Sequence, residues 1–248
     1  MTVSPSADHY SLSGTFNFRD TGGLRTEDGA KIRPGVLLRS AQLSGLDDAG
    51  HATLRELGVS DVHDLRGQRE IKHIGADRLP EGIQLTITPF DSRMAEAPPH
   101  ETLTLTAYTH MLEVYRMFPA LPEAHTAILA LAESIVRGTG AVLVHCAAGK
   151  DRTGWAVATL LRAVGVTEAD VRTDYLLSNV AVDALRVLID TKLPSGAEAS
   201  ADLLGVRTEY LESATASMRE LHGDLSGYLS AIGLTAELRA RLRTRLLE

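Results

Sequence analysis

The sequence predicts an α/β fold in which a short, mostly parallel sheet is flanked by helices. Across residues 1–145, short β-rich apolar runs alternate with stretches of helical periodicity, and the later pattern is helical. Strands that alternate with helices are joined by crossovers, which make neighbouring strands parallel and cover both faces of the sheet. The helices after the last strand are expected to form a C-terminal extension of the same domain.

The first half of the chain is expected to supply most of the strands. An N-terminal arm at 1–13 precedes a run from Phe16 that begins as a short strand and ends in the Gly22-Gly23 turn. Alternating apolar residues predict strands, and apolar residues at helical spacing predict a helix. The expected elements are strands at 36–39, 59–65 and 83–88, and a helix at 46–57 that Gly58 ends.

The second half begins with a Pro-, Ala- and Glu-rich loop at 92–102. Pro119 should break or kink the helical pattern around it, because proline lacks the backbone N–H of a helix interior. Thr167 and Thr235 are expected N-caps. The expected elements are a strand at 141–145 and helices at 104–118, 120–137, 152–164, about 178–191, about 206–221 and 235–247.

The composition is that of a folded globular protein of 248 residues, with 44% hydrophobic and 23% charged residues. No internal repeat or clear linker interrupts it, so residues 14–248 are interpreted as one domain. The formal net charge of −7 argues against nucleic acid or an anionic membrane as a partner.

The sequence also bears on location. Residues 1–10 lack the apolar core of a secretory signal, and no apolar stretch is long enough to span a bilayer. The single cysteine cannot form an internal disulfide, which fits a reducing compartment. We expect a cytoplasmic protein, or one secreted by a route without a recognisable signal peptide.

The most informative stretch runs from His145 to Gly154. An apolar strand precedes it and an apolar run of helical length follows, so it is predicted to be a tight loop at a helix N-terminus. Backbone N–H groups and the positive end of the helix dipole converge at such a loop. Cys146 and Arg152 lie at its two ends, which indicates an anion site with a sulfur nucleophile at its floor.

The loop residues suit a phosphate group in particular. Ala147, Ala148 and Gly149 are small, so their amides can approach phosphate oxygens closely, and Gly149 can adopt a positive φ. The guanidinium of Arg152 can bind two oxygens at once. The same donors favour the thiolate form of Cys146 and stabilise charge on a transferring phosphoryl group. Attack by the sulfur would give a cysteinyl-phosphate, which water then hydrolyses.

The stretch matches H-C-x-x-G-x-x-R-T-G, the signature of the cysteine-dependent protein tyrosine phosphatase superfamily. More narrowly, the chain resembles the atypical bacterial tyrosine and dual-specificity phosphatases over about residues 14–235. The segments that carry this resemblance are Phe16–Asp20, Leu38–Ser40, Asp64–Arg66, Ala148–Gly154, Asp174–Leu176 with Ser178–Asn179, and Leu204–Arg207.

The resemblance implies a role for each matching residue. Cys146 would be the nucleophile, Arg152 would bind the phosphate, His145 would orient the cysteine backbone, and Thr153 would hydrogen-bond the sulfur. Lysine at the position of Lys150 recurs in phosphoinositide phosphatases. Phosphoinositides therefore join phosphotyrosine, phosphoserine and phosphothreonine in proteins as candidate substrates. The resemblance implies no cofactor.

The proton donor for the leaving group has two candidates, because a carboxylic acid near the loop should supply that proton. Asp91 ends a predicted strand and resembles the mobile acid loop of the superfamily, but it lies farther from the cysteine than is usual in small members. Asp151 lies inside the signature itself. Our hypothesis is that Asp151 does most of the proton transfer and that Asp91 positions it or water.

Alternative interpretations remain beside these. The chain could be a phospho-ligand binding protein without catalysis, although inactive phosphatases usually lack the cysteine or the arginine. Lys150 could be a solvated surface lysine, Asp64 and Arg66 a structural ion pair, and Arg66 and Glu70 an i,i+4 pair. The histidine spacing predicts no metal site. Residues 92–118 and 178–206 are either surface helices or a lid over the loop.

Overall fold

The computed structural model describes residues 11–90, 107–190 and 200–248 of the chain. A five-stranded sheet with the strand order β1-β2-β5-β3-β4 forms its centre. β1 pairs antiparallel with β2, and the other neighbours are parallel, which confirms the mostly parallel sheet. The strands are β1 (Arg19–Asp20), β2 (Leu37–Ser40), β3 (Val59–Asp64), β4 (Gln84–Ile87) and β5 (Ala141–His145).

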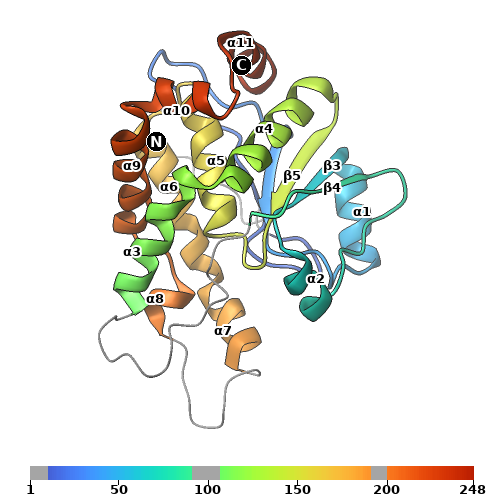
Figure 1. Cartoon of the computed structure of the whole chain (residues 1–248). Coiled ribbons are helices and arrows are strands. Elements are labelled where there is room, and N and C mark those ends of the chain that lie inside the picture. The colour runs from blue at the N-terminus through green and yellow to red at the C-terminus, as the bar shows by residue number, and fades with distance from the viewer. Residues whose placement is uncertain (1–10, 91–106, 191–199) are drawn as a thin grey trace, which may run out of the picture.

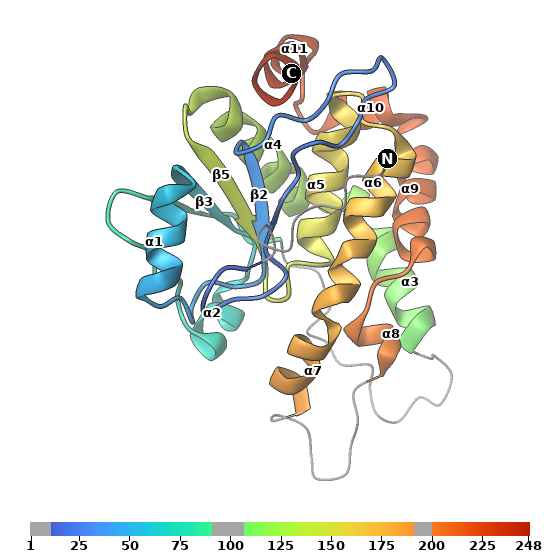
Figure 2. The ribbon, with the colours of Figure 1, turned by 180° about the vertical axis from the view of Figure 1, so that it is seen from behind.

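Helices cover both faces of this sheet (Figures 1 and 2). In chain order, the α-helices are α1 (Asp48–Glu56), α2 (Gln68–Ile74), α3 (Ala107–Met117), α4 (Pro122–Arg137), α5 (Arg152–Ala163), α6 (Glu168–Leu176), α7 (Val182–Asp190), α8 (Ala201–Leu204), α9 (Thr208–His222), α10 (Leu225–Ala231) and α11 (Ala236–Leu246). Two 3-10 turns, η3 (Phe118–Ala120) and η4 (Leu177–Ala181), join α3 to α4 and α6 to α7.

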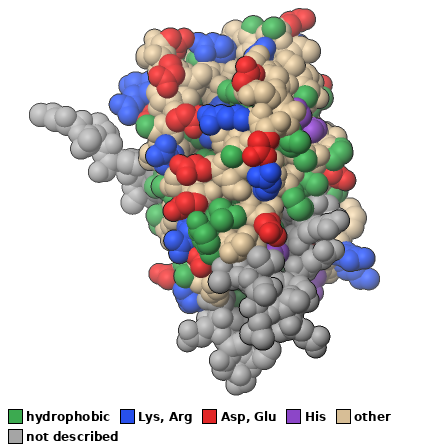
Figure 3. Space-filling view, turned by 60° about the vertical axis from the view of Figure 1, so that its left-hand side comes forward, with side chains coloured by type: hydrophobic (Ala, Val, Ile, Leu, Met, Phe, Trp, Pro, Cys, Tyr) green, Lys and Arg blue, Asp and Glu red, His purple; other side chains and the backbone are tan. Residues whose placement is uncertain are grey.

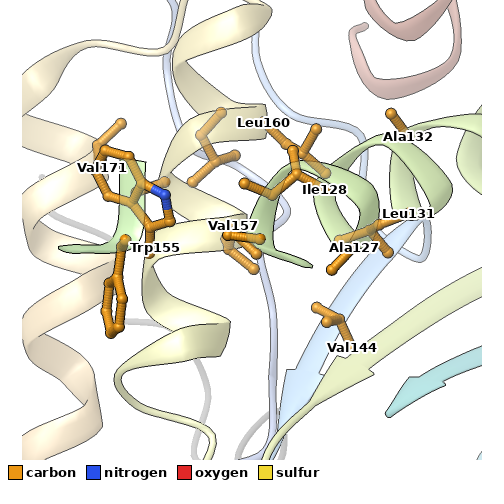
Figure 4. Close-up of a cluster of buried hydrophobic side chains, with 14 of the residues drawn as sticks. Ala127, Ile128, Leu131, Ala132, Val144, Trp155, Val157, Leu160 and Val171 are labelled. Carbon is orange, nitrogen blue, oxygen red and sulfur yellow. The ribbon is translucent and has the colours of Figure 1, made fainter. Parts of the chain in front are cut away.

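The central strand β5 separates two hydrophobic cores, because successive side chains of a strand point to opposite faces. Val142 and Val144 belong to the larger core, to which α3–α6 and α9–α11 contribute. Leu143 belongs to the smaller core beneath α1. Figure 4 shows the larger core, where Trp155 and Val157 of α5 lie with Ile128 of α4. β5 is buried along its whole length, as a strand covered on both faces must be.

The C-terminal helices belong to the same body as the sheet. Ile32 forms an isolated antiparallel bridge with Leu247, and the backbones of Lys31 and Glu248 exchange two hydrogen bonds. α11 also packs against α4. No helix in the described ranges is both long and apolar enough to cross a membrane. On the face shown in Figure 3, acidic and basic side chains are interspersed.

Most predicted elements are confirmed within a few residues, including the break at Pro119 and the N-caps Thr167 and Thr235. Sequence periodicity missed α2, α8 and α10. α2 has no buried residue, so it carries no apolar stripe to detect. The alternation at 83–88 gives an edge strand whose Leu85 and Ile87 are exposed. The predicted loop at 92–102 lies outside the described residues.

Candidate active site

The loop between β5 and α5 lies at the carboxyl edge of the parallel strands, where ligands of open α/β sheets bind. Its carbonyl oxygens are held from outside the loop. The bound carbonyls and their partners are Cys146 with His145 Nδ1 at 3.2 Å, Ala147 with the Gln42 amide at 3.2 Å, Ala148 with Asn17 Nδ2 at 2.9 Å, and Gly149 with Arg39 at 2.9 Å.

These contacts fix the direction of the loop amides. In a planar trans peptide, the N–H of each residue points opposite to the carbonyl of the residue before it. Since the carbonyls of residues 146–149 point to the surrounding protein, the amides of residues 147–150 point to the opposite side. Within the described ranges, none of these amides has a protein acceptor. Their direction is the one required by the anion site that the sequence predicts.

Gly149 has to be glycine for this loop to exist. Its φ is +67°, a region that residues with a Cβ rarely adopt. A Cβ built on it would lie 2.0 Å from the carbonyl oxygen of Ser40 on β2. The loop therefore packs directly on the neighbouring strand through Gly149.

Arg152 is aimed by Glu70, which lies on α2. Two terminal nitrogens of Arg152 each donate to one Glu70 oxygen at 2.6 Å. Burial opposes the charge of Glu70, but its hydrogen bond and ion pair with Arg152 lower its pKa overall. Burial likewise opposes the charge of Arg152, while Glu70 and the Cys146 sulfur raise its pKa. The Nε of Arg152 is buried with no partner among the described residues, which leaves a donor for a phosphate oxygen.

This finding corrects the expected i,i+4 pair of Arg66 and Glu70. Arg66 lies before α2 and donates to Asp64 at 2.8 Å and to Asp77 at 2.8 Å, so the predicted Asp64–Arg66 ion pair is confirmed. Glu70 turns to Arg152 instead, because α2 begins only at Gln68 and Arg66 is outside its helical register.

His145 reaches the same ionic cluster from the end of β5. Its Nε2 lies 2.7 Å from Asp77 Oδ2, and its Nδ1 lies 3.2 Å from the carbonyl oxygen of Cys146, whose backbone it is predicted to orient. Burial opposes the charge of Asp77, but the bond to His145 and the charge of Arg66 lower its pKa. Asp64, Asp77 and His145 have the geometry of metal ligands, yet Arg66 already supplies a cation to both carboxylates.

Lys150 and Asp151 are both buried, so Lys150 is not a solvated surface lysine. Its Nζ lies 2.9 Å from Asp151 Oδ2 and 3.1 Å from Oδ1, and it also donates to the carbonyl of Gly205 at 3.2 Å. Asp151 Oδ1 accepts a second hydrogen bond from the Tyr115 hydroxyl at 2.9 Å.

Thr153 and Asp91 are the two other residues predicted to take part in catalysis. The Thr153 hydroxyl is buried without a partner in the described part of the chain, so the expected hydrogen bond to the Cys146 sulfur is not formed in this structure. Asp91 lies outside the described residues. Its neighbour Phe90 is buried, and the Phe90 amide donates to the carbonyl of Leu65, which also accepts from Arg152.

A second buried network, centred on Asp174, also supports the loop. Asp174 of α6 accepts from Arg19 at 2.8 Å and from Arg39 at 2.5 Å. Burial opposes the charge of Asp174, but these two arginines lower its pKa. Arg39 in turn holds the Gly149 carbonyl, so the network fixes the loop to the sheet. Sequence reasoning noted these segments as part of the resemblance and gave them no role at the loop.

A cavity of about 650 Å³ opens above the loop. Cys146, Lys150, Asp151, Arg152 and Glu70 contribute to its floor. Its other walls are mainly apolar and include Met111 of α3, Leu185, Leu188 and Ile189 of α7, and Leu203 of α8.

Described parts of both segments that were considered as a lid line the cavity. Residues 107–117 form α3, whose Met111, Val114 and Tyr115 are buried against the core. α7 and α8 of the second segment also line the cavity, and residues 92–106 and 191–199 of the two segments lie outside the described residues.

Comparisons with known proteins show which proteins this chain is similar to. A relative from Mycobacterium tuberculosis, named triple specificity protein phosphatase PtpB, is 38% identical over 95% of this chain and 98% of its own. A putative tyrosine-protein phosphatase of Cupriavidus necator is 30% identical over 86% of this chain and 80% of its own. The crystal structure of TpbA from P. aeruginosa is 18% identical, with a TM-score of 0.38 over 82% of this chain and 89% of that one. The model of the tyrosine phosphatase family matches residues 10–248, and the chain belongs to that family.

Proposed function

We propose that the chain hydrolyses phosphotyrosine in proteins through a cysteinyl-phosphate on Cys146. The observation that carries this proposal is the direction of the loop amides. Four carbonyl oxygens are bound on the outer side, so consecutive N–H groups converge on the cavity next to Cys146 and the Arg152 guanidinium. Donors arranged in this way before the reaction bind a phosphate dianion and stabilise its transition state without further reorganisation.

In the first step, the sulfur of Cys146 attacks phosphorus. The S–P bond forms, the bond between phosphorus and the tyrosine oxygen breaks, and a proton passes to that oxygen from Asp151. Arg152 and the loop amides bind the three equatorial oxygens. Glu70 holds Arg152 in a fixed orientation, so little entropy is lost when the phosphate binds.

In the second step, a water molecule attacks phosphorus and gives its proton to Asp151. The S–P bond breaks, which regenerates the Cys146 thiolate and releases inorganic phosphate. Asp151 is our choice for both proton transfers because it belongs to the loop and lines the cavity together with Cys146. Asp151→Asn should reduce turnover strongly. This choice would be overturned if Asp151→Asn kept near-normal turnover while Asp91→Asn was inactive.

The walls of the cavity favour an aromatic ester over a polyanionic head group. Its described lining is mainly apolar, and its two described arginine and lysine side chains already face carboxylates, Arg152 with Glu70 and Lys150 with Asp151. A phosphorylated tyrosine places one phosphate at the floor and an apolar ring against the walls. The name of the mycobacterial relative states a triple specificity, so phosphoserine, phosphothreonine and phosphoinositides belong in the test.

The test compares the wild-type protein with Cys146→Ser under reducing conditions. We expect a phosphotyrosine peptide and para-nitrophenyl phosphate to be hydrolysed by the wild type alone, with vanadate inhibition and no effect of a metal chelator. Binding of the peptide without release of phosphate would support the phospho-ligand binding protein instead. Faster hydrolysis of phosphoinositides than of phosphotyrosine peptides would overturn the choice of substrate.

We also propose that residues 14–248 act as one phosphatase domain. The support is the path of the chain: the C-terminal residues pair with the segment at 31–33, and α11 packs on α4 next to the sheet. Removing α11 should therefore expose the larger core and destabilise the catalytic loop. Limited proteolysis that released an active fragment lacking α11 would contradict this.

A further inference from the structure

A chain of buried hydroxyl groups ends on the Asp151 carboxyl group. The Tyr175 hydroxyl donates to the Tyr115 hydroxyl at 2.8 Å, and Tyr115 donates to Asp151 Oδ1 at 2.9 Å. Tyr115 comes from α3 and Tyr175 from α6, so two helices far apart in the sequence supply it. The rings meet edge to face, with centroids 6.3 Å apart.

Both tyrosines are fixed in place. Tyr115 is wholly buried, and its ring also contacts Phe118 and Tyr210. Tyr175 is 1% exposed and packs on Gly154 of α5, where an added Cβ would lie 3.0 Å from its ring. A side chain at position 154 would therefore displace Tyr175.

The two tyrosine hydroxyl groups stay protonated, and the carboxyl oxygen of Asp151 determines the direction of their hydrogen bonds. Burial and the nearby charge of Asp151 raise the pKa of Tyr115 well above its ordinary value. Burial, and then the charge of Asp151, do the same for Tyr175. Both hydroxyls therefore keep their protons, and a tyrosine has only one proton to donate. The Asp151 oxygen accepts, so Tyr115 gives its single proton to Asp151 and its own oxygen accepts the proton of Tyr175.

The two oxygens of Asp151 consequently differ. Oδ1 accepts from Tyr115 and from Lys150 at 3.1 Å, so both of its lone pairs are used. Oδ2 accepts from Lys150 at 2.9 Å and from no other donor among the described residues. A proton on the carboxyl group is therefore carried by Oδ2.

We propose that Tyr115, held by Tyr175, is a positioning residue that fixes the Asp151 carboxyl group with Oδ2 as the proton-donating oxygen. This inference rests on the proposed function, since it requires Asp151 to protonate the leaving tyrosine oxygen. In the reverse transfer, the same oxygen takes the proton of the attacking water. The hydroxyl chain itself gains and loses no proton in either step.

The test uses the dependence of the rate on the leaving group. A phosphotyrosine peptide releases a weakly acidic phenol and needs the proton, whereas para-nitrophenyl phosphate releases a much more acidic phenol and needs it less. For Tyr115→Phe we expect kcat for the peptide to fall about tenfold, the size of one lost hydrogen bond, with KM nearly unchanged. The loss for para-nitrophenyl phosphate should be clearly smaller.

Tyr210→Phe is the matched control. Its ring lies 5.6 Å from that of Tyr115, but its hydroxyl donates to the carbonyl of Asp202 and not to Asp151. This variant should leave both substrates unaffected. Tyr175→Phe should reproduce the substrate pattern of Tyr115→Phe more weakly. Equal losses for both substrates in Tyr115→Phe, or the same pattern in Tyr210→Phe, would overturn the inference.

Asp151→Asn separates this inference from the proposed function. If Asp151→Asn slows hydrolysis of the peptide more than that of para-nitrophenyl phosphate and Tyr115→Phe does not, the inference about Tyr115 fails and the proposed role of Asp151 stands. If Asp151→Asn slows hydrolysis of the two substrates by the same factor, the proposed role of Asp151 fails, and the inference fails with it. When both are selective, Tyr115→Phe should add no further loss in the Asp151→Asn background. Additive losses would count against positioning, since they would place Tyr115 on a separate path.

Discussion

His63 gives the protein a dependence of stability on pH that can be measured directly. This histidine lies inside β3, is fully buried, and has no partner for either ring nitrogen among the described residues. Burial, which disfavours the charged imidazolium, lowers its pKa to about 4, and the positive charge of Arg137 adds to this shift. In the unfolded chain the pKa returns to its ordinary value of about 6.5.

The sign of the effect follows from these two values. Between about pH 6.5 and pH 4, the unfolded chain binds a proton at His63 that the folded protein does not, so acidification favours unfolding. Above this window the contribution vanishes. Each pH unit below the pKa of His63 in the unfolded chain corresponds to about 1.4 kcal/mol. At pH 5, His63 should therefore lower the free energy of unfolding by about 2 kcal/mol.

The assay compares the wild type with His63→Asn by urea unfolding at about pH 7.5 and about pH 5. Any loss of packing in the variant is present at both pH values, and the lowered pKa values of Glu70 and Asp77 act in both proteins. The wild type should therefore lose about 2 kcal/mol more than His63→Asn on acidification. An equal loss in the two proteins would refute the reasoning, because it would show that His63 accepts its proton in the folded state.

Three further changes test the loop. Gly149→Ala should destabilise the protein by about 1–2 kcal/mol because of its positive φ, and by more because the new Cβ also meets the Ser40 carbonyl. The melting temperature and kcat should both fall, and unchanged values would show that the loop can shift. Glu70→Gln should lower kcat about 100-fold with an unchanged melting temperature, since Arg152 loses its fixed orientation; a wild-type kcat would show that Arg152 is aimed by other contacts. Lys150→Ala should reduce hydrolysis of phosphotyrosine and phosphoinositide by similar factors, because Lys150 bonds to the proposed proton donor; a loss confined to phosphoinositides would instead indicate a lipid-binding lysine.

The sequence was most informative where structure depends on neighbouring residues. The strand, loop and helix around Cys146 were predicted because apolar runs, small residues and an arginine at fixed spacing have local consequences for the backbone. The positive φ of Gly149 belongs to the same local chemistry. The capping threonines were found for this reason too, since each cap bonds an amide three residues away.

Sequence reasoning was weakest for buried charges. A charged residue read in a sequence is expected on the surface, because burial without a partner is costly. Arg39 and Asp174 are buried and pair with each other across 135 residues of the chain, and Arg66 is buried with a second partner, Asp77, that the sequence did not indicate. Lys150 is another case, since its burial depends on Asp151 and on the carbonyl of Gly205.

By itself, then, the sequence determined the α/β class and the loop from His145 to Gly154, and it predicted Cys146 as the nucleophile and Arg152 as the phosphate-binding arginine. Only the tertiary structure decided what holds that loop. Its supports are Asn17, Arg39, Glu70, Asp77 and Tyr115, which reach it from elements 36 to 131 residues away along the chain. The physical reason is that a buried polar group must find a hydrogen-bond partner, and packing rather than local spacing determines which one comes within reach.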